Sequence, residues 1–175
     1  DFLRNYLKNL YLPDERAMPF WPDDKKIAMI LTHDVDSDLI FKQKDILDNF
    51  LDIEEKYGFR SCWYFISNRY EINHKVLDYL KERGHEIGFH GDLHDYRLPY
   101  LSRKKMRKRL DKAKWFLDKY NIKGGRAPLF LRTPKFLEIL SDYVEYDTSF
   151  HDTTYGSISG DKEGSCTCFP FFYND

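Results

Sequence analysis

Short apolar runs alternate with segments of helical periodicity along most of this chain. The runs predict buried strands over 27–32, 60–66, 85–89 and 144–149. In the segments between them, apolar residues recur three and four positions apart, which predicts amphipathic helices over 38–57, 73–83, 102–120 and 134–142. Strand and helix alternate at least four times, and this pattern predicts an α/β fold with a mostly parallel sheet.

Length and charge limit the classes of protein to which the chain can belong. Its 175 residues are enough for one globular domain with its own core. The formal net charge of -1 gives no indication of a nucleic-acid partner, and no run reaches the roughly 18 apolar residues of a membrane-spanning helix. No signal peptide is visible, so the compartment, cytoplasmic or associated with the cell surface, stays open, as does the oligomeric state. Three cysteines predict no disulfide framework.

Carboxylates and histidines are concentrated in two clusters, each directly after an apolar run. The clusters are Thr32-His33-Asp34-Val35-Asp36 and His90-Gly91-Asp92-Leu93-His94. Residues i and i+2 of a strand point to one side, and histidines at i and i+4 share one face of a helical turn. Parallel α/β folds place their active sites beyond the carboxyl ends of the strands. The clusters therefore predict a site in which one Asp and two His hold a metal and leave positions open for water and substrate.

Each cluster taken alone has a second interpretation. The D-x-D of Asp34 and Asp36 is also found as a capping or surface feature and as the metal motif of nucleotide-sugar transferases. A single histidine is more often a core or surface residue, but the pair His90 and His94 beside a D-x-D favours a metal site. The metalloprotease motif H-E-x-x-H is excluded because Gly91 stands where the Glu would act as base. The spare carboxylate of the first cluster is the expected base.

The basic run Arg103-Lys104-Lys105-Met106-Arg107-Lys108-Arg109 has a simpler interpretation than a binding patch. It lies in the segment that predicts the longest amphipathic helix. A charged face on such a helix is usually exposed to solvent. We therefore expect a solvated helix face here and no phosphate-binding site.

Four motifs, in order, resemble those of the polysaccharide deacetylase family, also called the NodB-homology or carbohydrate esterase 4 family. Thr32 to Asp36 is similar to the HDVD branch of the first motif, and His90 to His94 to the second motif, with Gly91 in place of the usual Ser or Thr. Arg126-Ala127-Pro128 matches the third motif, and Tyr146-Asp147-Thr148-Ser149 resembles the fourth. The likeness covers roughly residues 26–150, which we take as the core of a catalytic domain over 26–175, incomplete at its C-terminus, after an extension over 1–25.

The resemblance implies a distorted (β/α) barrel and a divalent metal, with zinc preferred and cobalt, nickel or manganese as alternatives. Asp36, His90 and His94 are the implied metal ligands, and Asp34 is the implied base. The implied role of Arg126 is to pair with Asp34, since a nearby cation lowers the pKa of a carboxyl group. Backbone N–H groups near Asp92–Leu93 or at Arg126–Ala127 are expected to stabilise the oxyanion.

The remaining site residues are assigned on position. Asp147 of the fourth motif is expected among the catalytic residues. His33 and Pro128 are expected to support the site or to bind substrate. The family takes its general acid from a histidine in a fifth motif that this chain does not show, and His151 is a candidate substitute.

We therefore expect a metal-dependent hydrolase that removes N-acetyl groups from an N-acetylated sugar, with a carbohydrate as its binding partner. Because the acid motif is missing and Gly91 departs from the motif, a catalytically degenerate relative that binds carbohydrate is the alternative. A D-x-D glycosyltransferase is a third interpretation, although it leaves His90 and His94 without a role.

Overall fold

The computed structural model describes residues 28–150 together with Asp23 and Lys25. The chain divides after Ile30 into two units, and the fold described below is that of the second unit, which begins at Leu31. Within the described part of the chain, no helix combines the length and the apolar character that a membrane crossing requires.

In the described part of the chain, five parallel strands form one sheet, and their order in the sheet is their order in the sequence. The strands are β1 (Leu31–Val35), β2 (Ser61–Phe65), β3 (Glu86–Phe89), β4 (Gly124–Gly125) and β5 (Tyr146–Asp147). The α/β class and the parallel sheet predicted from the sequence are confirmed. A sequential order of parallel strands is also the order in a (β/α) barrel, while closure into a distorted barrel stays a prediction.

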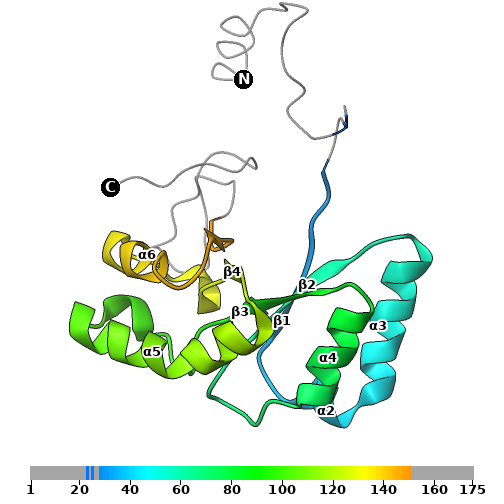
Figure 1. Cartoon of the computed structure of the whole chain (residues 1–175), viewed down its shortest axis with the longest axis horizontal. Helices are drawn as coiled ribbons and strands as arrows, with labels where there is room; N and C mark the ends of the chain where they lie inside the picture. The colour runs from blue at the N-terminus through cyan, green and yellow to red at the C-terminus, as the bar shows by residue number, and fades with distance from the viewer. Residues whose placement is uncertain (1–22, 24, 26–27, 151–175) are drawn as a thin grey trace, which may run out of the picture. The chain divides into compact units, whose positions relative to one another are not determined.

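Helices connect the successive strands. They are α2 (Leu39–Lys42), α3 (Lys44–Lys56), α4 (His74–Glu82), α5 (Arg103–Tyr120) and α6 (Pro134–Leu140), with short 3-10 turns η2 (Leu98–Tyr100) and η3 (Pro128–Phe130). Figure 1 shows α3 and α4 side by side near β1 and β2, and α5 and α6 together beyond β3 and β4. Each helix thus returns the chain to the start of the next parallel strand.

Three predicted boundaries were wrong. The first strand begins at Leu31 and not at residue 27, because Leu31 pairs with Ser61, the first residue of β2, and Met29 and Ile30 are exposed. The helix expected over 38–57 is two helices, since Gln43 leaves the helical region with φ −121° and ψ 78°. The last strand is two residues long because its partner β4 is equally short. The sequence also predicts a short helix over 2–10 and a Gly- and Ser-rich loop over 156–168, and both lie outside the described residues.

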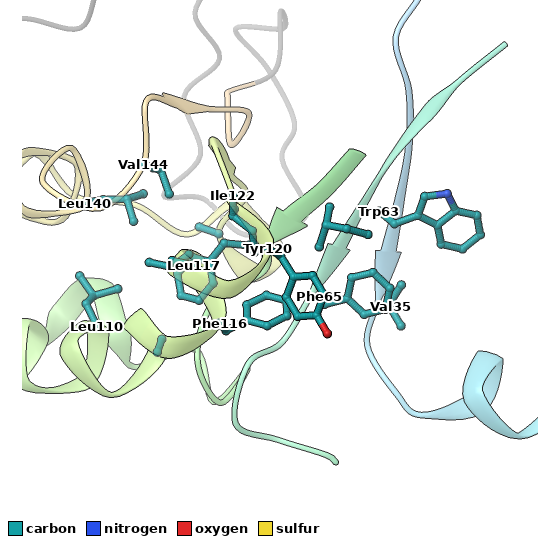
Figure 2. Packing of buried hydrophobic residues seen from close by; sticks show 14 of the residues in the cluster. Val35, Trp63, Phe65, Leu110, Phe116, Leu117, Tyr120, Ile122, Leu140 and Val144 are labelled. Atoms are coloured by element: carbon teal, nitrogen blue, oxygen red, sulfur yellow. The ribbon is translucent and has the colours of Figure 1, made fainter. Parts of the chain in front are cut away.

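The apolar core lies between the sheet and helices α3 to α6. Figure 2 shows Val35 and Phe65 from the strands packed near Phe116, Leu117 and Tyr120 of α5. Because side chains alternate along a strand, the neighbours of these strand residues point to the other side. Asp34 on β1 and Tyr64 on β2 pair in the register and lie on that opposite face. The helix face therefore builds the core, and the other face is available for the site.

Candidate metal centre

The first cluster lies at the end of β1. Asp34 is the fourth residue of the strand, and Asp36 follows its last residue, Val35. The two carboxylates are two positions apart and point to the same side, as the strand period requires. Val35 between them is buried in the core. The strand thus holds the backbone of this cluster while both carboxylates face the carboxyl edge of the sheet.

The second cluster follows β3 as an irregular loop. We expected a helical turn to bring His90 and His94 together, and this is wrong. Gly91, His94 and Tyr96 have φ values of 80°, 54° and 60°, which is the left-handed region. A left-handed conformation costs roughly 1–3 kcal/mol at a residue with a side chain, and it persists only where the surroundings hold it in place. The histidines therefore converge through a strained loop that other elements must support.

Asp36, His90 and His94 converge on one point. Their ligand atoms all lie within 4.8 Å of one another. The Asp36 Oδ1 atom is 3.3 Å from His90 Nε2 and 3.1 Å from His94 Nε2. Zinc–ligand bonds of about 2.0–2.2 Å in a tetrahedron put neighbouring ligand atoms about 3.3–3.6 Å apart. The donor set and its spacing therefore fit a tetrahedral divalent metal with one position open.

His90 is prepared to act as a ligand through Nε2. Its Nδ1 donates a hydrogen bond to the backbone carbonyl of Arg126 at 2.8 Å, which leaves the lone pair on Nε2. Burial lowers the pKa of the His90 imidazole, against the opposing effect of nearby Asp34 and Asp36. A metal ligand must be the neutral imidazole, so this environment favours the form that binds. His94 differs, because its buried Nδ1 has no hydrogen-bond partner among the described residues.

Asp34 stands beside the three ligand residues and contacts Arg126. Its Oδ2 lies 3.9 Å from His90 Nε2, farther than Asp36 Oδ1, which is 3.3 Å from the same atom. The Arg126 guanidinium donates to Asp34 Oδ1 at 3.0 Å and to Thr32 Oγ1 at 2.9 Å. The same guanidinium lies over the Tyr64 ring, 4.6 Å from its centroid. The expected pairing of Arg126 with Asp34 is therefore present, and it holds this carboxylate apart from the ligands.

Asp147 lies at the end of β5 and holds a neighbouring loop. It accepts hydrogen bonds from the N–H and the hydroxyl of Ser149, and burial raises the pKa of its carboxyl. The Ser149 hydroxyl in turn accepts from the N–H of Ala127 at 2.7 Å. The N–H of Arg126 donates to the carbonyl of Phe89. The expectation that the N–H groups of Arg126 and Ala127 stabilise an oxyanion is therefore wrong, because both already donate to other acceptors within the protein.

The supporting residues predicted from the sequence lie in different places. Pro128 packs next to the second cluster, since a Cβ on Gly91 would lie 3.3 Å from its ring. His33 points away from Asp34 and meets Glu54 of α3 at 2.5 Å and the Trp63 ring at 4.2 Å. The structure therefore does not bring His33 into the cluster. His151 lies outside the described residues.

Three further residues contact the site, although the sequence gives none of them a role there: Tyr64, Thr148 of the fourth motif and Arg109 of the basic run. Tyr64 stacks on Arg126, and its hydroxyl accepts a hydrogen bond from Thr148 Oγ1 at 3.1 Å. Thr148 also accepts from Arg126 Nε. Arg109 binds Asp92 and Asp95 beside the candidate ligands His90 and His94. Their spacing in sequence could not reveal them, because each contact crosses from one element to another.

The fold and the cluster define an α/β protein with a candidate metal centre at the carboxyl edge of a parallel sheet. The chain belongs to the polysaccharide deacetylase family, whose model matches residues 22–155. No curated protein sequence matches the chain.

Solved structures show the same fold at low sequence identity. A presumed polysaccharide deacetylase from Mycobacterium smegmatis superposes with a TM-score of 0.61 at 22% identity, over 77% of this chain and 55% of that one. A family 4 carbohydrate esterase from Streptomyces lividans, solved with acetate, gives 0.58 at 13% identity over 72% and 64%. A pseudoenzyme of carbohydrate esterase family 4 from Bacillus anthracis gives 0.57 at 17% over 68% and 42%. The chain thus matches less than two thirds of the length of each of these proteins.

Proposed function

We propose that this chain is a metal-dependent hydrolase that removes N-acetyl groups from an N-acetylated sugar of a glycan. One observation carries the proposal: three ligand atoms converge at metal-binding distances while a fourth group, Asp34, is held beside them by Arg126. Family membership supports deacetylation as the reaction and a carbohydrate as the substrate.

Asp36, His90 and His94 would hold the ion. A divalent metal in such a site polarises a carbonyl oxygen and lowers the pKa of a water molecule. Asp34 has the position of the general base, because it lies 3.9 Å from His90 Nε2 without being one of the three proposed ligands. Arg126 holds that carboxylate in place through a hydrogen bond of 3.0 Å. The formal charges agree. Arg109 pairs with Asp92 and Asp95, and Arg126 pairs with Asp34, while Asp36 contacts the two histidines. These four carboxylates and two guanidinium groups leave two negative charges for a divalent cation to balance.

Acetate release from chitin oligosaccharides and peptidoglycan fragments tests the reaction. We expect Asp34→Asn to lower kcat about 10²–10⁴-fold, as loss of a general base does, while the variant still binds Zn²⁺. Asp36→Ala serves as the matched control, and it should lose metal binding together with activity. Wild-type turnover by Asp34→Asn, or full activity in chelator-treated protein, would contradict the proposal.

A carbohydrate-binding relative without turnover is the second candidate. Among residues 28–150, the histidines outside the cluster contact other parts of the chain. None of them is therefore placed to act as the general acid that protonates the leaving amine. His33 and His85 bind the glutamates of α3, and His74 binds Tyr120. A similar fold also belongs to a pseudoenzyme. Binding of the glycan fragments without acetate release would favour this candidate.

A further inference from the structure

Arg109 differs from the other arginines of the basic run on α5. The side chains of Arg103 and Arg107 are 54% and 47% exposed, and they pair with Glu138 and Asp142 at the surface. The Arg109 side chain is only 16% exposed. The expectation of a solvated helix face therefore fails at this one residue, which turns inward toward the second cluster.

The Arg109 guanidinium makes four hydrogen bonds to two carboxylates. Nε and Nη2 donate to Asp92 at 2.6 and 2.5 Å, and Nη1 and Nη2 donate to Asp95 at 2.9 and 3.0 Å. Asp92 lies between the two metal-ligand histidines, and Asp95 directly follows His94. Only the planar fork of an arginine can hold two carboxylates in this way, because a lysine has one point charge.

The conformation of the loop that Arg109 contacts depends on support from other elements. Its residues Gly91, His94 and Tyr96 are in the left-handed region and belong to no helix or strand. On one side, the N–H groups of Ser67 and Asn68 hold the carbonyls of Gly91 and Asp92. On the other side, Arg109 holds the side chains. His94 itself has no hydrogen bond at Nδ1 within the described part of the chain, so its position depends on the backbone to either side.

We propose that Arg109 is a positioning residue for the metal centre, acting through Asp92 and Asp95 to place His94 relative to His90 and Asp36. This inference rests on the proposed function, since it assigns Arg109 a role at that site. Residues that orient metal ligands typically change metal affinity 10- to 100-fold when they are mutated. The effect of Arg109 should therefore appear in metal binding itself, before any turnover.

Binding of Co²⁺ and Zn²⁺ to the purified chain tests the proposal. The variants are Arg109→Lys, Arg109→Ala and Asp95→Asn, and Arg107→Ala is the matched control two residues away on the same helix. We expect Arg109→Ala to weaken Co²⁺ affinity about 10- to 100-fold and Arg109→Lys to weaken it less, since the ammonium keeps the charge but not the fork. The visible spectrum of bound Co²⁺, which reports the ligand geometry, should change in both variants and stay unchanged in Arg107→Ala.

The melting temperature of the metal-free variants separates positioning from simple stabilisation. If Arg109→Lys melts lower but binds Co²⁺ with wild-type affinity and an unchanged spectrum, Arg109 is only structural and the proposal is overturned. If Arg109→Ala does not fold, Arg109→Lys and Asp95→Asn decide the question, because they keep most of the buried contacts. If wild-type protein binds neither metal, the proposed function itself fails. If wild type binds metal and Arg109→Lys binds it equally well with an unchanged spectrum, the role of Arg109 alone fails.

Discussion

At the scale of single residues, Gly91 shows why this chain departs from the family motif. The motif usually has Ser or Thr at this position, but here the backbone has φ +80° and a Cβ would meet the Pro128 ring at 3.3 Å. Both conditions disfavour any side chain. The departure is therefore a consequence of the left-handed loop and does not by itself indicate a lost activity.

Gly91→Ser should destabilise the protein. The left-handed φ and the contact with Pro128 together should lower the free energy of unfolding by about 1–3 kcal/mol, measured by urea denaturation. Gly58→Ala is the matched control, because Gly58 has φ +77° and nothing within 4 Å of the added Cβ. It should show the cost of the φ angle alone. An effect of Gly91→Ser no larger than that of Gly58→Ala would mean that the contact with Pro128 relaxes without cost.

At the scale of elements, a chain of polar groups fixes helix α3 to the sheet. Glu54 is buried and accepts hydrogen bonds from His33 of β1 at 2.5 Å and from Ser61 of β2 at 2.7 Å. The N–H of Ser61 donates to His85 Nδ1, so the proton of that imidazole is on Nε2, which faces Glu55 at 3.1 Å. These contacts lie on the helix face of the sheet, away from the metal centre, and explain the direction in which His33 points.

Ser61→Ala should loosen α3 from the sheet. It removes a donor from the buried Glu54 carboxylate, and an unsatisfied buried group of this kind costs about 1–3 kcal/mol. Chemical denaturation should show this loss. Ser141→Ala is the matched control, since Ser141 Oγ donates to a helix carbonyl at the surface and its loss should change stability by less than about 0.5 kcal/mol. Equal effects of the two substitutions would contradict the role assigned to Ser61.

At the scale of the whole molecule, an ion pair between Glu55 of α3 and Arg83 at the C-terminal end of α4 makes stability depend on pH. Hydrogen bonds from Arg83 lower the pKa of Glu55 from 4.5 to about 2, with burial opposing and His85 adding to the effect. The folded state therefore binds the proton less readily than the unfolded chain between these values. The contribution of Glu55 is fully present above pH 4.5 and is lost as the pH falls toward about 2.

Glu55→Gln should make the free energy of unfolding less dependent on pH between pH 4.5 and about 2. Its free energy of unfolding should fall less than that of wild type between pH 4.5 and about 2, because no carboxylate is left to protonate. Urea denaturation at several pH values measures the difference. Asp147→Asn should have the opposite effect. Burial raises the pKa of Asp147, so the contribution of this carboxyl to the free energy of unfolding increases as the pH falls, and the Asn variant loses that increase. Parallel profiles for wild type and Glu55→Gln would refute the assignment.

The sequence predicts the fold class and the clustering of the site residues, but not every strand boundary or loop conformation. The strand–helix alternation and the clusters at strand ends follow from local periodicity, so the α/β class and the convergence of Asp36 with His90 and His94 could be anticipated. The start of β1 could not, because it is set by the pairing of Leu31 with Ser61, 30 residues away. The loop conformation at His94 could not either, since it depends on Ser67, Asn68 and Arg109 from other elements.

Arg126 serves the site twice, with two different parts of itself. Its backbone carbonyl fixes the imidazole of His90, and its side chain fixes Asp34. The carbonyl is present whatever the side chain, so a single codon change at this position can release the base and leave the ligand in place. Under the proposed function, a descendant of such a protein can therefore lose turnover in one step and keep the fold and the cluster of Asp36, His90 and His94. A hydrolase and a relative that only binds carbohydrate can then differ by a single substitution.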